Sequence, residues 1–211
     1  MYVTQPTARD AMIDAAERLI AERGIAAMTL KDVQIAAGQS NRSAAKYHFG
    51  SREGLLDAII EVRMSPVNAR RELLLVEMEA NSSSPNMRRA VEVMVKPIAE
   101  ETLGRKDSRY ARFLGQAMFD PLLAEAIQEH LSAESFRRAE EIVIRLANVP
   151  LEVAQWRAEN IVNLTLVTLS RWEALDRSPE LTDRIVADLV DTCVAVLEAT
   201  STDAFGSEVS R

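Results

Sequence analysis

The sequence predicts an all-α protein, in which a small N-terminal unit of three helices precedes a larger helical part. Two observations carry this prediction. Hydrophobic residues make up 47% of the 211 residues but aromatic residues only 5%, so aliphatic side chains dominate the apolar positions, which favours helices over sheets. Apolar residues also recur at helical spacing along most of the chain, in segments separated by Gly, Pro, Asn and Ser.

The first helix is expected to begin after Thr7 and to end at Gly24. Thr7, followed by Asp10 three residues later, forms a capping-box pattern, and apolar residues follow at helical spacing. Glycine at the end of a helix can take the left-handed backbone conformation without a Cβ penalty.

The second helix is expected to be short, over about residues 30–37. Thr29 and Asp32 repeat the capping pattern at its start, and Gly38 ends it and opens a tight turn. Its inward residues are expected to be Leu30, Val33, Ala36 and Ala37.

The third helix, expected over about residues 41–49, carries polar and basic side chains. Ala45 and Phe49, four residues apart, are expected to face the core. A short helix of this kind after a Gly-containing turn is the arrangement that enters the DNA major groove. Between residues 38 and 54 only Glu53 is acidic, so the local charge favours a polyanion although the whole chain carries -7. This segment therefore predicts a DNA-binding helix-turn-helix.

The N-terminal pattern resembles that of TetR-type (TetR/AcrR) bacterial transcriptional regulators over about residues 9–60. The matching positions are Gly24, Thr29, Asp32, Val33, Ala36, Ala37, Gly38, Tyr47, His48, Phe49, Ser51, Arg52, Glu53, Leu55 and Leu56. The stretch from Gly38 to Phe49 is one residue longer than the common family form. The resemblance implies a one-component repressor that binds a near-palindromic operator in double-stranded DNA as a homodimer and is released by a small-molecule effector. The DNA contacts that it implies are Thr29, Asn41, Arg42, Ser43, Lys46, Tyr47, His48 and Arg52.

The domain organisation follows from this pattern. Residues 1–54 are expected to form the DNA-binding domain, residues 55–200 a helical effector-binding and dimerisation domain, and residues 201–211 a flexible tail. Two long helices are expected near residues 152–175 and 180–200, and the second is apolar on more than one side. One side can pack within the subunit and the other against a partner; the alternative is one larger monomeric core. The expected dimer interface comprises Trp156, Leu164, Ile185, Leu189, Val190, Val194 and Leu197.

An effector pocket is expected between the DNA-binding unit and the C-terminal helices. Soft and aromatic side chains there could line a cavity or simply belong to the core. The residues expected to line the pocket are Met94, Tyr110, Phe113, Met118, Phe119 and Trp172. Few charges interrupt these apolar positions, which favours an apolar or amphiphilic ligand.

The composition argues against an enzyme, an exported protein and a membrane protein. The chain has only His48 and His130, one cysteine and no Gly-rich phosphate loop, so no catalytic site, cofactor or metal is expected. Cys193 cannot form an internal disulfide, and the longest apolar run is about half the roughly 20 residues that a membrane span needs, so we expect a cytoplasmic protein. The alternative function is a helical small-molecule-binding or adaptor protein that has lost operator binding.

Overall fold

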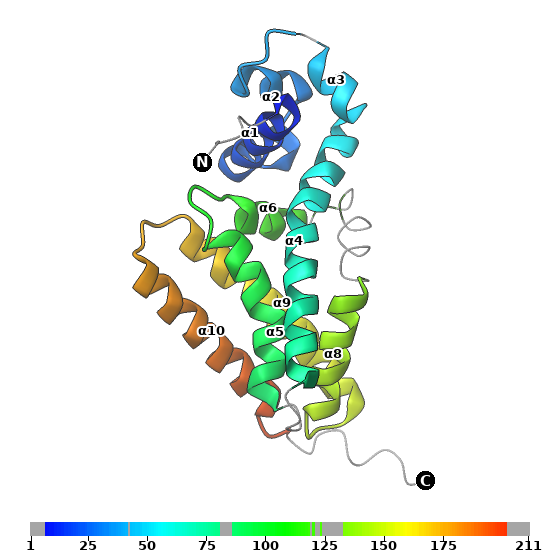
Figure 1. Ribbon diagram of the computed structural model, residues 1–211, viewed down its shortest axis with the longest axis vertical. Coiled ribbons are helices and arrows are strands. Elements are labelled where there is room, and N and C mark those ends of the chain that lie inside the picture. Colours follow the sequence, from blue (N-terminus) through cyan, green and yellow to red (C-terminus); the bar gives the residue numbers. More distant parts are fainter. Residues whose placement is uncertain are drawn as a thin grey trace.

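The protein is helical throughout the residues that its computed structural model describes, which are 7–41, 43–80, 86–118, 120, 123 and 133–201. Figure 1 shows these helices, and the predicted all-α fold is confirmed. The helices are α1 (Ala8–Arg23), the 3₁₀ turn η1 (Ile25–Ala27), α2 (Leu30–Ala36), α3 (Ala44–Phe49), α4 (Arg52–Ala80), α5 (Met87–Thr102), α6 (Tyr110–Ala117), α8 (Glu134–Leu146), α9 (Leu151–Glu173) and α10 (Pro179–Glu198). Within the described residues, none of these helices has the length and apolarity needed to cross a membrane.

The first three helices gather at one end of the molecule, at the top of Figure 1. The predicted capping box at the start of α1 is confirmed, because Thr7 Oγ1 accepts a hydrogen bond from Asp10 N at 3.2 Å while the Asp10 carboxylate accepts one from Thr7 N. At the other end of α1, Gly24 has a φ of 88°, which a side chain would disfavour. Local sequence signals therefore set both ends of this helix.

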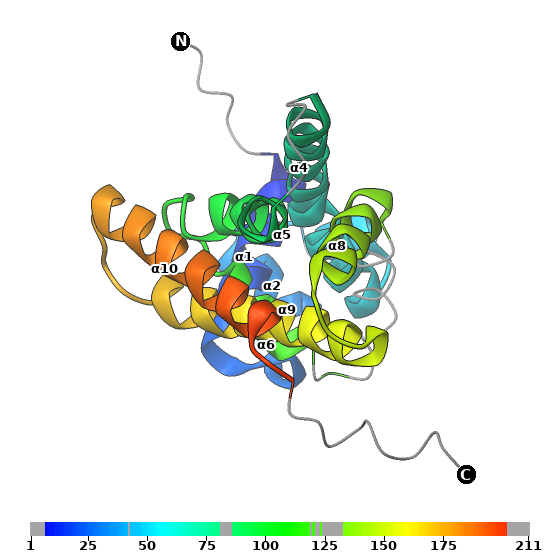
Figure 2. The ribbon, with the colours of Figure 1, turned by 90° about the horizontal axis from the view of Figure 1, so that it is seen from below.

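The long helix α4 leads from the N-terminal unit into the larger helical part, where α5 is the central helix. Seen from below, α5 lies among α4, α8, α9 and α10 (Figure 2), and it contacts all four. This position explains why α5 is buried on several sides, with Val91, Val93 and Val95 all inaccessible to solvent. Pro97 lies inside α5 without dividing it.

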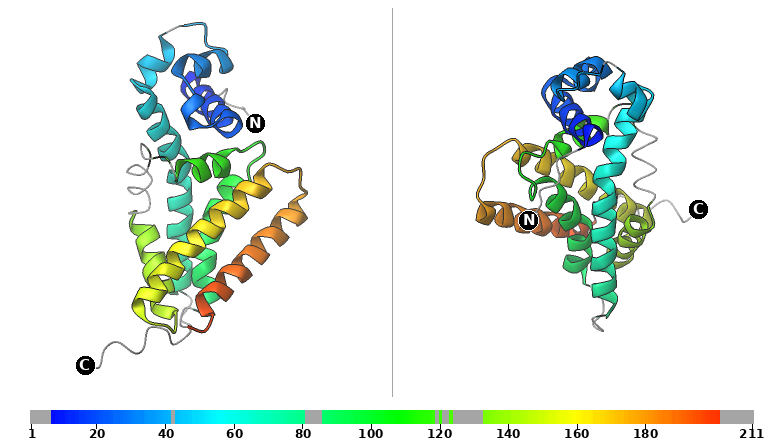
Figure 3. Two further views of the ribbon diagram at one scale, coloured as in Figure 1. Left: turned by 180° about the vertical axis from the view of Figure 1, so that it is seen from behind. Right: turned by 45° about the horizontal axis from the view of Figure 1, so that its top comes forward.

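The last two helices, α9 and α10, lie side by side on one face of the molecule (Figure 3, left). Helix α10 also packs on α5, so both of its apolar sides are used within one chain. Ile185, Leu189, Val190 and Leu197 are accordingly at most 7% exposed. Helix α5 supplies the second packing surface that the sequence had suggested was a partner chain, so these four residues are covered within one chain. Their place in a dimer interface stays a prediction.

The predicted division of the chain at residues 54 and 55 falls inside a helix. Helix α4 begins at Arg52 and continues to Ala80 without interruption, so the N-terminal unit is connected to the larger part by a rigid element. The division into domains stays a prediction.

Candidate nucleic-acid interface

The connection between α2 and α3 is longer than the sequence had predicted. Gly38 has a φ of 66°, as expected of the residue that stops α2, but α3 begins at Ala44 and not near Asn41. The Asn41 side chain accepts a hydrogen bond from Ser43 N at 3.0 Å, and Gln34 Nε2 donates to the Asn41 carbonyl at 2.8 Å. An Asn side chain that binds the backbone two residues on favours a turn over a helix. Asn41 and Ser43 therefore precede α3.

Helix α3 has one anchored face and one exposed face. Ala44, Ala45 and Phe49 are buried in the core, which confirms the inward prediction for Ala45 and Phe49. Lys46, Tyr47 and His48 are exposed, and the Tyr47 side chain is 84% accessible. The Tyr47 and His48 rings meet edge to face with centroids 5.1 Å apart. The buried face holds α3 against the core. The exposed face carries the ammonium of Lys46, the phenol of Tyr47 and the imidazole of His48, all accessible to a ligand.

Two other residues that were expected to contact DNA make hydrogen bonds within the chain, and a third lies outside the described residues. Thr29 is exposed, and its hydroxyl accepts from Asp32 N at 3.2 Å at the start of α2. The Arg52 guanidinium donates to the carbonyls of Ile25 at 2.6 Å and Met28 at 3.2 Å, so it supports η1. The DNA contact expected of Arg52 stays a prediction. Arg42 lies outside the described residues.

The sequence reasoning did not identify the outer face of α2. Ile35 is 67% exposed and Ala36 is also exposed, so the inward prediction for Ala36 is wrong. Only Val33 of this helix is fully buried. Ile35 lies two residues after Val33 and so does not share the buried face of α2. This spacing was the sequence signal that the Ile35 side chain lies outside the core.

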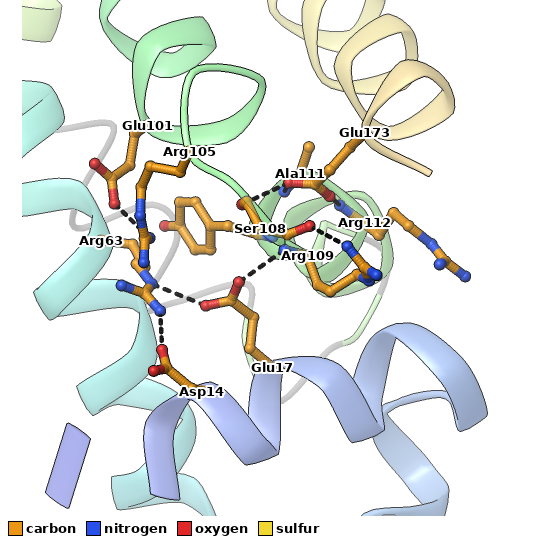
Figure 4. Close-up of polar contacts among 11 residues, drawn as sticks. Asp14, Glu17, Arg63, Glu101, Arg105, Ser108, Arg109, Ala111, Arg112 and Glu173 are labelled. Atoms are coloured by element: carbon orange, nitrogen blue, oxygen red, sulfur yellow. Dashed lines mark hydrogen bonds and ion pairs between the residues drawn. The ribbon is translucent and has the colours of Figure 1, made fainter. Parts of the chain in front are cut away.

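An ionic cluster, in which Arg63 and Glu17 are buried and Asp14 is exposed, joins the N-terminal unit to the larger part (Figure 4). Arg63 of α4 donates to Glu17 Oε2 at 2.8 Å and to Asp14 Oδ1 at 2.5 Å, both on α1. Burial is the largest influence on the pKa of Arg63 and acts to lower it, but the two carboxylates outweigh burial and raise the pKa. The other oxygen of Glu17 accepts from Arg109 N at 3.0 Å, just before α6. One carboxylate therefore binds α4 and the start of α6 to α1.

Glu173, at the end of α9, lies at the N-terminus of α6. Its carboxylate accepts from Ser108 Oγ at 2.7 Å, Ala111 N at 3.1 Å and Arg112 N at 3.0 Å, and its side chain is 4% exposed. Figure 4 shows this side chain pointing at the first turn of α6. A carboxylate at this place satisfies backbone N–H groups that have no partner within the helix and complements the helix dipole.

Helix α6 also binds the other end of α1. Arg112 Nη2 donates to the Ala21 carbonyl at 2.6 Å, and Gln116 Nε2 donates to the Ile20 carbonyl at 3.1 Å. These carbonyls belong to the last turn of α1, where carbonyl oxygens run short of N–H donors within the helix. The Ile20 carbonyl also accepts from Gly24 N at 2.8 Å. The N-terminal unit is thus seated on α6 through hydrogen bonds at both ends of the contact. The sequence reasoning missed Glu17 and Glu173, although Glu17 follows Ile13 by four residues and precedes Ile20 by three.

Among the described residues, those expected to line an effector pocket differ in burial, and the pocket stays a prediction. Tyr110 and Phe113 of α6 are completely buried and stacked, with ring centroids 5.8 Å apart, and Met94 of α5 is 6% exposed. Met118 and Trp172 are partly buried, and Phe119 lies outside the described residues. A groove of about 410 Å³ lies between α5 and α10, and none of these residues lines it. The walls of this groove include the charged residues Arg88, Glu92, Lys96, Glu100 and Asp183.

The remaining residues of the expected dimer interface differ in their accessibility. Trp156 of α9 is 43% exposed, whereas Leu164 and Val194 are partly buried. Val167 of α9, which the sequence analysis did not select, is 64% exposed. The exposed apolar surface therefore lies on α9 and not on α10.

Comparison with known proteins shows which proteins share this sequence pattern and this fold. The described helices form a helix-turn-helix unit, in which one face of α3 is exposed, attached to a larger helical part. Residues 12–59 match the sequence model described as bacterial regulatory proteins, tetR family. No curated protein matches the chain.

Solved structures share the fold of nearly the whole chain. AmtR from Mycobacterium smegmatis has a TM-score of 0.62 at 19% identity, over 95% of this chain and 90% of AmtR. The fatty acid degradation regulator FadR from Bacillus halodurans has a TM-score of 0.62 at 16% identity, over 90% of this chain and 96% of FadR. PfmR, a TetR family transcriptional regulator from Thermus thermophilus, has a TM-score of 0.58 at 17% identity, over 90% of this chain and 99% of PfmR.

The resemblance to TetR-type regulators is confirmed by these findings. Residues 12–59 match the tetR family model, and nearly the whole chain shares its fold with PfmR, a TetR family transcriptional regulator.

Proposed function

We propose that this chain is a one-component transcriptional regulator that binds double-stranded DNA through the outer face of α3. The observation that carries the proposal is the exposure of Lys46, Tyr47 and His48 on a helix whose other face is anchored by Ala45 and Phe49. Ammonium, phenol and imidazole groups donate to phosphate oxygens, and such contacts fix the register of a helix in the groove. Asn41 and Ser43, just before α3, are the proposed additional contacts.

The test begins with selection of bound fragments from the source genome, which yields the operator. Affinity for this operator is then measured at several salt concentrations. Tyr47→Ala is expected to weaken binding by about tenfold, the loss of one good contact. Lys46→Ala is expected to weaken binding and to reduce the slope of log affinity against log salt by about one, because one phosphate contact is removed.

Lys106→Ala is the matched control, because Lys106 is exposed in the connection between α5 and α6, away from α3. Its affinity and salt slope are expected to equal those of the unchanged chain. The same affinity in all three variants would contradict the assignment of α3 as the DNA-reading helix.

We further propose that the chain forms a two-fold dimer through the outer surface of α9 and α10. These helices lie side by side on one face (Figure 3, left). Trp156 and Val167 stand about three turns apart on α9, on the same side of the helix, and both are exposed large apolar residues. Two helices from each subunit would form a four-helix contact. A dimer would present two α3 helices to half-sites about one DNA turn apart, which is why a near-palindromic operator is proposed.

Val167→Glu tests this interface, because it places a charge in the proposed contact without disturbing the core. The dissociation constant of the dimer, measured by sedimentation equilibrium, is expected to rise by at least tenfold. Leu73→Glu is the matched control, since Leu73 is 57% exposed on α4, far from this face. If the two variants dimerise equally well, the interface lies elsewhere.

A small-molecule effector is proposed to release the repressor from its operator. Helix α6 supports this proposal, because Glu17, Arg112 and Gln116 connect it to both ends of the contact with α1. A ligand that favours another position of α6 would therefore shift α1 and, in a dimer, the spacing of the two recognition helices. A reporter gene behind the operator distinguishes repression from activation, since deletion of a repressor raises reporter expression.

The lengthened connection before α3 favours a second candidate, a helical adaptor that has lost operator binding. The Asn41 turn leaves α3 only the residues Ala44–Phe49, a short helix for reading bases. The salt-dependent binding experiment separates the two candidates, because an adaptor would retain no genomic fragment above background.

A further inference from the structure

Arg71 is a charged side chain on the buried face of α4. It is 2% exposed, and its neighbours on this face, Val67, Leu74 and Leu75, are at most 3% exposed. Helix α4 packs here against α5 and α8, both of which bury mainly apolar side chains. A guanidinium in such surroundings has lost its hydration and needs compensation from the protein or from a ligand.

The described residues supply little of that compensation. Arg71 Nη1 donates to Asn68 Oδ1 at 2.7 Å, and the guanidinium lies over the Phe136 ring of α8, 5.3 Å from its centroid. Arg71 Nε is buried without a hydrogen-bond partner. Among the residues that the structure describes, Arg71 has no carboxylate at ion-pair distance, which is 4.0 Å or less.

Arg63, two turns earlier on the same helix, shows what a compensated buried arginine looks like in this chain. It is 8% exposed and has two carboxylates, Glu17 and Asp14, within 2.8 Å. Opposite charges raise the pKa of Arg63. By contrast, burial alone lowers the pKa of Arg71 to about 10. Arg71 remains protonated at neutral pH and carries a buried positive charge.

A second buried polar group, on α8, also lacks a hydrogen-bond partner among the described residues. Ser135 directly precedes Phe136 on α8, and its hydroxyl is buried without a hydrogen bond. Arg71 thus places an unsatisfied guanidinium N–H on α4, and Ser135 an unsatisfied hydroxyl on α8, the helix that α4 packs against. Two such groups among apolar side chains match a ligand with one negative charge and an apolar body.

We propose that Arg71 binds the carboxylate of a small, otherwise apolar effector between α4, α5 and α8, with the Ser135 hydroxyl as a further donor. A carboxylate matches the planar guanidinium through paired N–H···O bonds, and its single charge balances that of Arg71. A phosphate monoester would bring excess charge into this apolar region. The inference rests on the proposed function, since it names the ligand class of the proposed effector site.

The experiment compares carboxylates with the alcohols of the same carbon skeleton. The probes are decanoate against decan-1-ol and 4-phenylbutyrate against 4-phenylbutan-1-ol, with binding measured by calorimetry. The unchanged protein is expected to bind at least one of the carboxylates tenfold more tightly than its alcohol. Arg71→Met is expected to abolish this preference, and Ser135→Ala to weaken carboxylate binding severalfold. Arg70→Met is the matched control, because Arg70 is the adjacent arginine, partly exposed and paired with Glu100, and it should keep the full preference.

Three outcomes would overturn the inference. The first is equal binding of carboxylates and alcohols by the unchanged protein, and the second is a preference that persists in Arg71→Met. The third is a lower unfolding temperature of Arg71→Met without ligand, because removing an uncompensated buried charge should leave stability equal or higher. Operator binding is measured separately. A preference for carboxylates without DNA binding supports this inference and contradicts the proposed function. DNA binding without a preference for carboxylates supports the proposed function and contradicts this inference.

Discussion

Replacing Glu173 with glutamine tests whether this buried carboxylate holds α6 in place. The two side chains have nearly the same shape, so packing is kept while the charge and one acceptor are removed. Oε1 of Glu173 accepts from Ser108 Oγ and Ala111 N, and Oε2 accepts from Arg112 N. An amide offers only one oxygen, so at least one of these buried donors would face an NH₂ group.

The expected loss of stability follows from these contacts. A buried donor left without an acceptor costs about 1–3 kcal/mol. The lost negative charge at the N-terminus of α6 adds up to about 2 kcal/mol in a partly buried place. We therefore expect the free energy of unfolding to fall by about 3 kcal/mol, which for a chain of this size lowers the unfolding temperature by about 6–12 °C.

Urea and thermal unfolding, followed by circular dichroism at one protein concentration, measure this loss. A fixed concentration is needed because dimerisation makes apparent stability depend on concentration. Glu152→Gln is the matched control, since Glu152 is exposed on the same helix and surface changes usually stay within about 0.5 kcal/mol. If Glu173→Gln loses less than about 1 kcal/mol, or no more than the control, the carboxylate does not hold α6.

Two further predictions concern one buried carboxylate, Glu17, and one partly buried carboxylate, Glu140. Glu17→Gln should destabilise the chain by about 3 kcal/mol, because it removes the 3% exposed partner of Arg63, and converting both residues to Met should recover most of the loss; urea midpoints check both. Burial, followed by the charges of Glu159 and Glu141, raises the pKa of Glu140. Protonation therefore favours the folded state, and this contribution is present below the ordinary glutamate pKa and is lost as pH rises through the raised value. Glu140→Gln should thus gain stability over the unchanged chain at pH 7 but not at pH 4, and an equal gain at both values would contradict the assignment.

The helix boundaries that could be predicted from the sequence are those set by local chemistry. Thr7 with Asp10 fixes the start of α1, and Gly24 and Gly38 have positive φ where α1 and α2 end. These signals involve residues within a few positions of one another, so no knowledge of the tertiary structure is needed. The start of α3 was predicted three residues too early, because the Asn41 side chain binds Ser43 N and holds a turn.

The packing partners of α10 could not be predicted from its own sequence. Its apolar residues occupy two sides, which correctly indicated two packing surfaces. Periodicity does not say which element supplies a surface, and here α5 and α9 supply both. The exposed apolar positions Trp156 and Val167 were difficult to distinguish from core residues for the same reason.

The candidate interface was easier to predict than the junction behind it. Lys46, Tyr47 and His48 stand out because polar side chains follow a glycine turn. Glu17 and Glu173 were overlooked because charged residues are usually exposed. They are buried because their partners are the backbone ends of another helix and a buried arginine, all distant in the sequence.

Three arginines of helix α4 lie at three successive places along the molecule. Arg52 supports η1 in the N-terminal unit, Arg63 is paired with α1, and Arg71 is buried without a carboxylate partner among the described residues. An anion at Arg71 would therefore act on the same rigid helix that directly follows α3, the proposed DNA-reading helix. Because linkage is reciprocal, the factor by which a carboxylate weakens operator binding must equal the factor by which the operator weakens carboxylate binding. Measuring both factors in the unchanged chain and in Arg71→Met shows whether the coupling passes through this residue.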